Sequence, residues 1–421
     1  MKTHPMITTM LNFKGNARGC VYTEPLNGIP ANLLAPYVTV YMLAIGLNEP
    51  QIGSLISIGW GFQLLVAIFS GVITDKMGRR KATLIFDILA SSIVTVFYAI
   101  AQNYWYFLIA SIIGSTIRIT QNSWTCLMVE DTDPEELIDV FSWIQIFSLL
   151  SGYFVPIAGL MIKSLDLVPA MRIILSIASV SYTIKAILTY MMTAETKQGM
   201  IRMEATKDVS LLSSLKEYDG VFKLLRNSPA ALVMLSIMTV MSITTLINGT
   251  FWSVIVTEKI GIPADNIAIF PFVKSLVMLF FFFEVIPRIK KFNFKIPLMV
   301  GFAGFLLSQI ILVLVPVSNY WILMISIILE AGSMAALSPL VDQMTIMTID
   351  AKERARMQSI LYVTIILITA PFGWIAGNLS AQEKAFPFIL NIALLGIGMV
   401  LSLVAGKIAE RNPSIVEIVS V

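Results

Sequence analysis

The sequence is poor in charge. Asp, Glu, Lys and Arg together make up 13% of its 421 residues, whereas hydrophobic types make up 57%. A soluble domain carries charge on about a quarter of its residues. Because so little charge is available and the mean hydropathy is +0.82, the composition excludes a water-soluble globular protein. It predicts a protein whose surface is largely covered by lipid.

Cysteine and histidine are nearly absent. The two cysteines, Cys20 and Cys126, predict neither a disulfide framework nor a metal site. The single histidine, His4, lies in the N-terminal tail, so a proton carrier inside the protein has to be a carboxylate. No phosphate-binding loop, metal-ligand cluster or nucleophile–base pair is visible. We therefore expect no enzyme, no cofactor or metal and, at a net charge of only +3, no nucleic-acid partner.

Twelve long apolar runs are present instead. A bilayer core about 30 Å thick needs about 20 apolar residues in one helix, and windows of that length predict twelve transmembrane helices. The first twenty residues are too polar for a secretory signal peptide. The predicted spans are residues 20–47, 50–74, 80–101, 105–129, 139–163, 170–193, 229–257, 263–287, 295–317, 320–347, 356–380 and 385–408.

One long polar segment, residues 194–228, divides the chain into halves. It predicts a cytoplasmic linker with an amphipathic helix on the membrane surface, and a regulatory or partner-binding role is the alternative. We expect an N-terminal six-helix bundle over residues 1–193 and a C-terminal six-helix bundle over residues 229–421. Two halves of equal span number are typical of an internal repeat.

Lys and Arg are unevenly distributed among the loops. If the N-terminus is inside, the tails and the even-numbered loops hold nearly all cations outside the spans. The exceptions are Lys163, Arg172, Lys259 and Lys384. By the positive-inside rule, both termini are predicted to be cytoplasmic, in a multi-pass protein of the cell membrane.

The loop between the second and third spans carries the strongest motif. It reads Gly-Val-Ile-Thr-Asp-Lys-Met-Gly-Arg-Arg-Lys over residues 71–81 and fits the pattern G-x-x-x-D-[RK]-x-G-R-[RK]-[RK]. In this position it resembles the cytoplasmic loop motif of the major facilitator superfamily of secondary transporters. The resemblance covers the whole chain and implies an all-α membrane protein with 12 transmembrane helices in two six-helix bundles. The matching residues are Gly71, Asp75, Lys76, Gly78, Arg79, Arg80 and Lys81.

The resemblance implies that this loop is a gate on the cytoplasmic side. Gly71 and Gly78 would permit close helix approach and a tight turn, and Asp75 would face the start of span 11 near residues 355–357. Arg79 would pair with an acid at the end of span 4, either Glu130 or Asp131. The alternative is that the cations only set topology, which is the simpler interpretation for Lys76 and Arg80. Loop 287–295 in the second half keeps the positive charge but lacks the Gly and Asp positions.

Ionisable residues inside predicted spans are costly and therefore mark candidate functional positions. Arg118 lies in the middle of span 4, and the spacing to Gln121 resembles a span-4 motif of the same family. Glu24 lies in span 1 among prolines that predict an irregular backbone, which is expected where a helix lines a cavity. Together, Glu24 and Arg118 resemble the proton and cation site of proton-driven multidrug exporters. The alternatives are an internal ion-pair strut for Arg118 and a helix start for Glu24.

The second half contributes further candidates. Glu330 in span 10 and Lys274 in span 8 are candidates for proton coupling and ligand contact. Asn248 and Trp252 flank a glycine in span 7 and are candidates for the substrate cavity, although such residues more often make helix–helix contacts. In the first half, Lys185 of span 6 is predicted to be structural and Asp87 of span 3 to make a polar packing contact.

These residues predict a monomeric, proton-coupled transporter that exports a small organic solute by alternating access, with protons, solute and membrane lipids as its partners. Glu24 or Glu330 would take the proton. The span-5 antiporter motif of the family is incomplete, with Ser151 and Val155 in place of glycines, so import remains open. A carrier of organic or phosphorylated anions is an alternative, because Arg118, Lys185 and Lys274 outnumber Glu24 and Glu330. A lipid or glycolipid flippase with a lateral cleft near residues 280–283, or a sensor without transport, is another.

Overall fold

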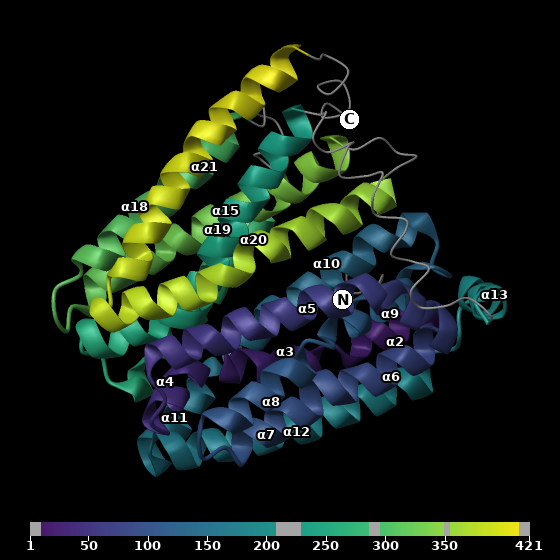
Figure 1. Cartoon of the computed structure of the whole chain (residues 1–421), viewed down its shortest axis with the longest axis horizontal. Coiled ribbons are helices and arrows are strands. Elements are labelled where there is room, and N and C mark those ends of the chain that lie inside the picture. Colours follow the sequence, from purple (N-terminus) through teal and green to yellow (C-terminus); the bar gives the residue numbers. More distant parts are fainter. Residues whose placement is uncertain (1–9, 208–228, 286–294, 349–353, 412–421) are drawn as a thin grey trace, which may run out of the picture. The chain divides into compact units, whose positions relative to one another are not determined.

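The computed structural model describes residues 10–207, 229–285, 295–348 and 354–411, and within these ranges all regular structure is helical (Figure 1). The tails, loop 287–294 and most of the predicted linker lie outside the described residues. The described chain divides into two compact units. Unit 1 contains residues 1–47 and 58–215, and unit 2 contains residues 48–57 and 216–421. The predicted bundle boundaries at residues 193 and 229 remain a prediction.

Ten helices are long and apolar enough to cross a membrane. They correspond to ten of the twelve predicted spans, because long runs of apolar side chains with few charges favour helix in lipid. The helical segments are 49–77, 79–99, 135–165, 167–192, 232–259, 264–285, 296–314, 320–341, 361–382 and 386–404. The other two predicted spans, the first and the fourth, are divided into shorter helices. Twelve membrane-spanning helices therefore remain a prediction.

The first predicted span forms three short helices. Proline causes the interruptions, since it has no N–H for the helical hydrogen bond and its ring crowds the preceding turn. Pro25 occupies the start of the second helix and Pro30 lies inside it. The irregular backbone that the prolines predict is present. The three helices are α2 (Gly15–Thr23), α3 (Pro25–Leu34) and α4 (Val38–Ala44).

The fourth predicted span is divided at Ser115 and Thr116. Their hydroxyl groups donate to the carbonyl oxygens of Ile112 and Ile113, at 2.6 and 2.7 Å. Hydroxyl groups that bond to nearby carbonyls bend or interrupt helices. The result is α8 (Tyr104–Gly114) followed by α9 (Ile117–Val129), so that Arg118 lies at the beginning of a new helix.

The rest of unit 1 consists of long helices with two irregular turns. A π-helix, η1, follows directly after Asp87, and a 3-10 turn, η2, interrupts span 5 before Pro156. The elements are α5 (Glu49–Met77), whose first residues belong to unit 2, α6 (Arg79–Asp87), η1 (Ile88–Ile93), α7 (Val94–Ala99), α10 (Pro134–Ser151), η2 (Gly152–Phe154), α11 (Val155–Leu165), α12 (Leu167–Met192) and α13 (Lys197–Ala205).

Unit 2, like unit 1, consists of long helices with a few irregular turns. Two of its helices end in π-helical turns, and the first residues of α5 pack on α20, where glycines at positions 53, 373 and 377 allow the backbones to approach closely. The elements are α15 (Pro229–Val254), η4 (Ile255–Lys259), η5 (Ala264–Asn266), α16 (Ile269–Phe280), η6 (Phe281–Val285), α18 (Lys295–Leu314), α19 (Tyr320–Thr348), α20 (Arg354–Gln382) and α21 (Phe386–Arg411).

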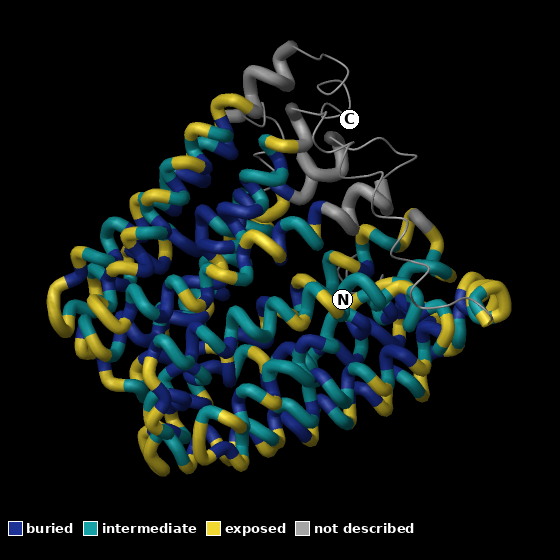
Figure 2. The backbone as a smooth tube through the Cα atoms, viewed as in Figure 1, coloured by how far each residue is buried: buried dark blue, intermediate teal, exposed yellow. Residues whose placement is uncertain are grey.

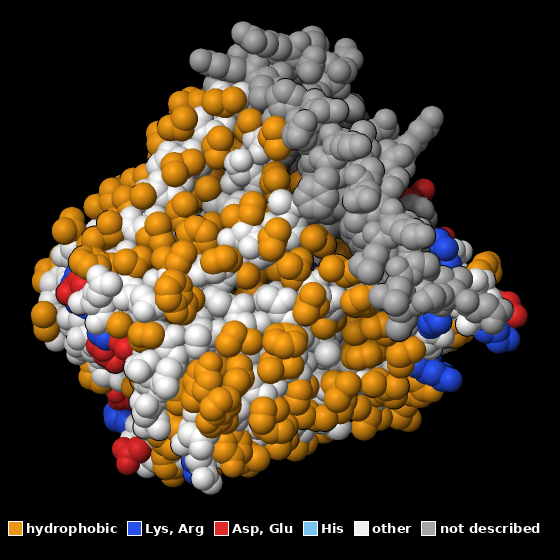
Figure 3. Space-filling view, viewed as in Figure 1, with side chains coloured by type: hydrophobic (Ala, Val, Ile, Leu, Met, Phe, Trp, Pro, Cys, Tyr) orange, Lys and Arg blue, Asp and Glu red, His pale blue; other side chains and the backbone are white. Residues whose placement is uncertain are grey.

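Burial follows the pattern of a membrane protein. Each helix has buried and exposed positions (Figure 2), and the exposed ones include many large apolar side chains, such as Leu160 and Trp321. Hydrophobic side chains cover most of the face in Figure 3, whereas charged side chains are few and lie toward its margins. An apolar surface of this extent is costly in water but not in lipid. The fold therefore agrees with a multi-pass membrane protein.

Candidate functional site

The motif loop forms a tight turn between α5 and α6. Gly78 separates the helices with φ of +83°, a region that other residues rarely adopt. A Cβ at Gly78 would lie 2.6 Å from an oxygen of Glu195, so glycine is required here by its conformation and by the available space. The turn places Arg79 at the first position of α6.

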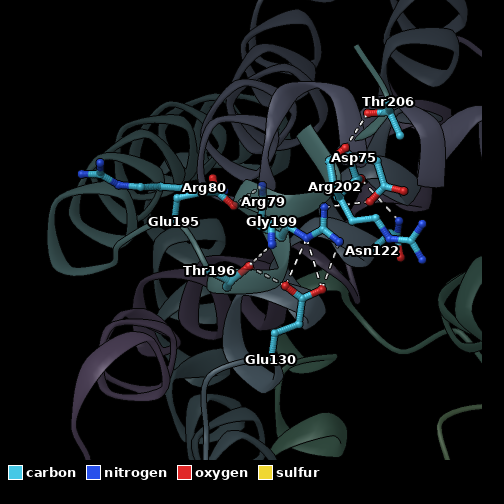
Figure 4. Close-up of polar contacts among 11 residues, drawn as sticks. Asp75, Arg79, Arg80, Asn122, Glu130, Glu195, Thr196, Gly199, Arg202 and Thr206 are labelled. Carbon is cyan, nitrogen blue, oxygen red and sulfur yellow. Dashed lines mark hydrogen bonds and ion pairs between the residues drawn. The ribbon is translucent and has the colours of Figure 1, made fainter. Parts of the chain in front are cut away.

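Arg79 is buried at the centre of a group of polar and charged residues, which we call the Arg79 cluster and which consists of Asp75, Arg79, Glu130, Glu195 and Thr196. Its guanidinium Nη1 lies 2.7 Å from Asp75 Oδ1 and its Nη2 lies 3.1 Å from Glu130 Oε1. The Arg79 side chain is only 5% exposed, and Figure 4 shows it between the two acids. The sequence suggested Glu130 or Asp131 as the partner, and Glu130 is the residue that binds Arg79. A buried guanidinium with two carboxylates is well compensated.

Two members of the cluster, Glu195 and Thr196, were not identified from the sequence. The Glu195 carboxylate accepts hydrogen bonds from the backbone N–H groups of Arg79 and Arg80, at 2.8 and 3.0 Å, and so caps the N-terminus of α6. Thr196 Oγ1 donates to Glu130 at 2.5 Å and accepts from the N–H of Gly199, which caps α13. The only signal in the sequence was the threonine itself, since Thr is a residue type that often precedes the first residue of a helix.

The other motif residues have different surroundings. The Arg80 guanidinium lies 3.8 Å from the centre of the Tyr190 ring, and its Nε donates to the Tyr190 carbonyl. Arg80 therefore has packing partners of its own, and its role in setting the topology stays a prediction. At Gly71 a Cβ would meet no atom within 4 Å. The close helix approach predicted at Gly71 is therefore not seen among the described residues. The partner predicted for Asp75, the side chains of residues 355–357, lies outside the described residues.

In α9, Arg118 forms a hydrogen bond with Gln121, the second residue of the span-4 motif. Its Nη1 donates to Gln121 Oε1 at 3.0 Å, a pair three residues apart on one helix face. One helical turn further, Asn122 Nδ2 donates to Thr74 Oγ1 at 3.3 Å. Asn122 therefore links α9 to α5 beside the Arg79 cluster.

Glu24 lies at the junction of α2 and α3 and is buried. Its carboxylate accepts a hydrogen bond from Asn27 Nδ2 at 3.3 Å. The ammonium of Lys185 acts on it electrostatically, and Lys185 forms an ion pair with Asp87 at 2.6 Å in which both side chains are almost fully buried. The sequence predicts two separate structural roles for Lys185 and Asp87, whereas in the structure these residues form an ion pair.

In unit 2 the two predicted ionisable residues contact each other. Lys274 Nζ of α16 lies 2.5 Å from Glu330 Oε1 of α19. The Glu330 side chain is 6% exposed and the Lys274 side chain 37% exposed, so the acid is buried and the lysine only partly so. A buried carboxylate with a single ionic partner can bind a proton when that partner leaves.

The two uncharged candidates in α15 pack against other helices. Asn248 Oδ1 accepts a long hydrogen bond of 3.4 Å from Asn391 of α21, which also donates to Gln309 of α18. The Trp252 ring packs edge-on against Phe270, with the ring centres 5.9 Å apart. These are the helix–helix contacts that the sequence gave as the alternative, and a ligand contact for either residue stays a prediction.

Comparison with known proteins agrees with this architecture. The model of the Major Facilitator Superfamily matches residues 26–296, more than half of the chain. No curated protein matches the sequence. Many solved structures share the fold. Three examples have low sequence identity, and in each the similarity covers nearly all of both chains.

A nucleoside transporter, NupG, has 12% identity and a TM-score of 0.69, over 93% of this chain and 98% of its own. A peptide transporter of the POT type, in complex with sulfate, has 15% identity and a TM-score of 0.68, over 98% and 99%. A POT family transporter in complex with 5-aminolevulinic acid has 15% identity and a TM-score of 0.66, over 95% and 96%. At such identities the likeness concerns the fold alone.

Proposed function

This chain belongs to the Major Facilitator Superfamily and is a membrane transporter rather than an enzyme, and we propose that it couples the movement of a small organic solute to protons. Export is the direction we favour, because Glu24 in span 1 and Arg118 in span 4 resemble the arrangement in proton-driven exporters. The transport cycle alternates between two states that open to opposite sides of the membrane.

The observation that carries the proposal is the ion pair between Lys274 and Glu330, on helices that are both candidate membrane spans. An ionised carboxylate at bilayer depth is stable only with a partner, and here that partner is one ammonium at 2.5 Å. Protonation of Glu330 removes its charge and releases Lys274. Loss of the proton restores the pair, so the proton is the switch between two local arrangements of α16 and α19.

The Arg79 cluster also supports a transport function, because it can act as a gate on the cytoplasmic side. Asp75 and Glu130 both bind Arg79, and Glu195 holds the beginning of α6. Buried ion pairs of this kind are worth little as net stability but specify one geometry. We propose that the cluster fixes the motif loop in the orientation needed to close the cytoplasmic side, with Asp75 as the residue that makes or breaks that closure.

Proton coupling can be tested with the purified protein in liposomes. A pH gradient is imposed, and a panel of solutes that includes lipophilic cations and organic anions is scored for solute-driven proton movement. The wild type should move protons with at least one solute, and Glu330→Gln should still exchange that solute without moving protons. Glu284→Gln, an acid at an exposed position of the neighbouring π-helix, is the matched control. Equal proton movement in Glu330→Gln and the wild type would contradict the proposal.

A further inference from the structure

Three amide side chains meet between α15, α18 and α21 in unit 2, and each belongs to a different candidate membrane span. We call them the amide triad; its members are Asn248, Gln309 and Asn391. Asn391 lies between the other two, because its Nδ2 donates to Asn248 Oδ1 of α15 and to Gln309 Oε1 of α18, both at 3.4 Å. Gln309 and Asn391 are fully buried, whereas Asn248 is only partly buried.

The amide triad lies beside the apolar core of unit 2. That core contains Met241 of α15, Phe305 of α18 and Leu395 of α21. On each of the three helices the amide is one or two turns away from this core residue, so the triad forms the next layer. Apolar packing therefore joins the helices on one side of the triad, and hydrogen bonds between side chains join them in the layer itself.

The hydrogen bonds of the triad are long and incomplete. An N–H···O bond is usually shorter than about 3.2 Å, whereas both bonds of Asn391 are 3.4 Å long. Among the described residues, Gln309 Nε2 and Asn391 Oδ1 have no hydrogen-bond partner, and both atoms are buried. A buried polar group without a partner is costly, above all inside a membrane. Asn391 is thus shared between two acceptors and bonds well to neither.

A second arrangement would give both of these atoms a partner. Two carboxamides that face each other can form two hydrogen bonds, one in each direction, because each has a donor and an acceptor. If Asn391 turns from Asn248 toward Gln309, its Oδ1 can accept from Gln309 Nε2 while its Nδ2 still donates to Gln309 Oε1. Asn248 then loses its bond, and this loss costs less than for a sealed group because Asn248 is only partly buried.

We propose that Asn391 is a positioning residue that exchanges between Asn248 and Gln309 and thereby holds or releases the middle of α15. In the arrangement described above, Asn391 ties α15 to α21. In the other arrangement, Asn391 and Gln309 form a two-bond pair, so that α18 and α21 stay joined while α15 loses its tether. The backbone beside Asn248 has room to move, since a Cβ on Gly249 would meet no atom within 4 Å. No proton takes part, so the exchange goes beyond the proposed function.

The exchange can be tested by hydrogen–deuterium exchange of the full-length protein in lipid, with mass spectrometry of peptides from α15 and α21. Backbone N–H groups exchange when a helix opens locally, so the rate in α15 reports how firmly that helix is held. Asn391→Leu removes both bonds and should speed exchange in the α15 peptide that contains residue 248. We expect an effect of about threefold, the size of one interhelical hydrogen bond in a membrane. An unchanged rate would overturn the positioning role.

Gln309→Met separates the exchange from a merely structural triad. Met is close to Gln in shape but has no amide, so Asn391 loses its alternative partner and should stay with Asn248. Deuterium uptake in the α15 peptide should therefore become slower than in the wild type. A structural triad predicts faster uptake, because one of its bonds is lost. Faster or unchanged uptake in Gln309→Met would overturn the proposal.

Asn248→Leu provides a second test if Gln309→Met does not fold. It removes the α15 side of the triad alone and leaves Asn391 to pair with Gln309. The α15 peptide should exchange faster and the α21 peptide with residue 391 more slowly, whereas faster exchange in both would contradict the proposal. Asn266→Leu is the control. It removes an exposed amide contact, in which Asn266 Nδ2 donates to the Tyr320 hydroxyl at 3.1 Å, and should leave both peptides at the wild-type rate.

Discussion

Replacing Glu195 by alanine removes the carboxylate that accepts from the N–H groups of Arg79 and Arg80, at 2.8 and 3.0 Å. Two of the N–H groups at the start of α6 then lose their protein acceptor. The Arg79 side chain keeps Asp75 and Glu130, so the effect of the substitution falls on the capping of the helix and leaves the ion pairs in place.

The magnitude follows from the capping geometry. Loss of a side-chain cap costs about 0.5–2 kcal/mol, and loss of an anion at a helix N-terminus costs about 0.3–1 kcal/mol. Glu195 is only partly buried, so water can replace part of what is lost. We expect the free energy of unfolding to fall by about 1–2 kcal/mol. Glu195→Gln keeps one acceptor oxygen but no charge, and it should lie between the wild type and the alanine variant.

The assay is equilibrium unfolding of the purified protein in mixed micelles. Glu204→Ala is the matched control, because Glu204 lies in α13 and its side chain is 78% exposed in a surface pair with Lys207. Such pairs contribute little. If Glu195→Ala unfolds with the same free energy as Glu204→Ala, the carboxylate does not cap α6 in the way described.

Three further outcomes follow from the same contacts. Asp75→Asn should slow transport while expression and solute affinity stay near wild type, as measured by uptake rate and binding, and wild-type turnover would count against a gate. Gly377→Ala should destabilise unit 2, since a Cβ there would meet the Glu49 carbonyl at 2.5 Å, and a thermal midpoint equal to wild type would show that the helices can separate freely. Lys274→Met and Glu330→Gln should each destabilise the protein, because each leaves an unpaired partner, whereas the double variant should be closer to wild type; additive losses would exclude a direct pair.

The fold was largely predictable because its main determinant is local. Runs of about 20 apolar residues are enough to predict a membrane helix, and ten of them are continuous in the structure. The prolines of span 1 predicted its irregular backbone. The interruption of span 4 was not predicted, because serine and threonine in a helix either bond to a carbonyl or point away. Which of the two occurs at Ser115 and Thr116 depends on their surroundings.

Site residues were predictable where a sequence motif identifies them. They were not predictable where residues far apart in the sequence meet only in the folded structure. The loop motif identified Arg79 and suggested Glu130, 51 residues away. Glu195 lies 116 residues from Arg79, and an acid in a polar linker carries no pattern that assigns it to a helix start. Likewise, Lys185 and Asp87 are separated by 98 residues. Each of these two residues could be explained by itself as a structural residue. Helical periodicity shows on which face of its helix a residue lies, but it does not show which residue of another helix packs against it.

The ion pair between Lys185 and Asp87 also changes the argument that a surplus of buried cations would favour an anionic substrate. The anion-carrier alternative depended on Arg118, Lys185 and Lys274 outnumbering Glu24 and Glu330. Asp87 belongs in that count, since it binds Lys185 at 2.6 Å inside the membrane-spanning part of unit 1. Three cations then face three carboxylates, and the cationic surplus that would attract an organic anion is gone.

A set of charges that balances only when every carboxylate is ionised is sensitive to protons. Each proton that binds leaves one cation in excess, and such a charge is costly at membrane depth unless a cation relocates or a solute anion compensates it. Because Lys274 and Lys185 each depend on carboxylates of their own unit, protonation acts on each unit separately. The charge balance therefore supports the proposed proton coupling rather than permanent attraction of anions by these buried groups.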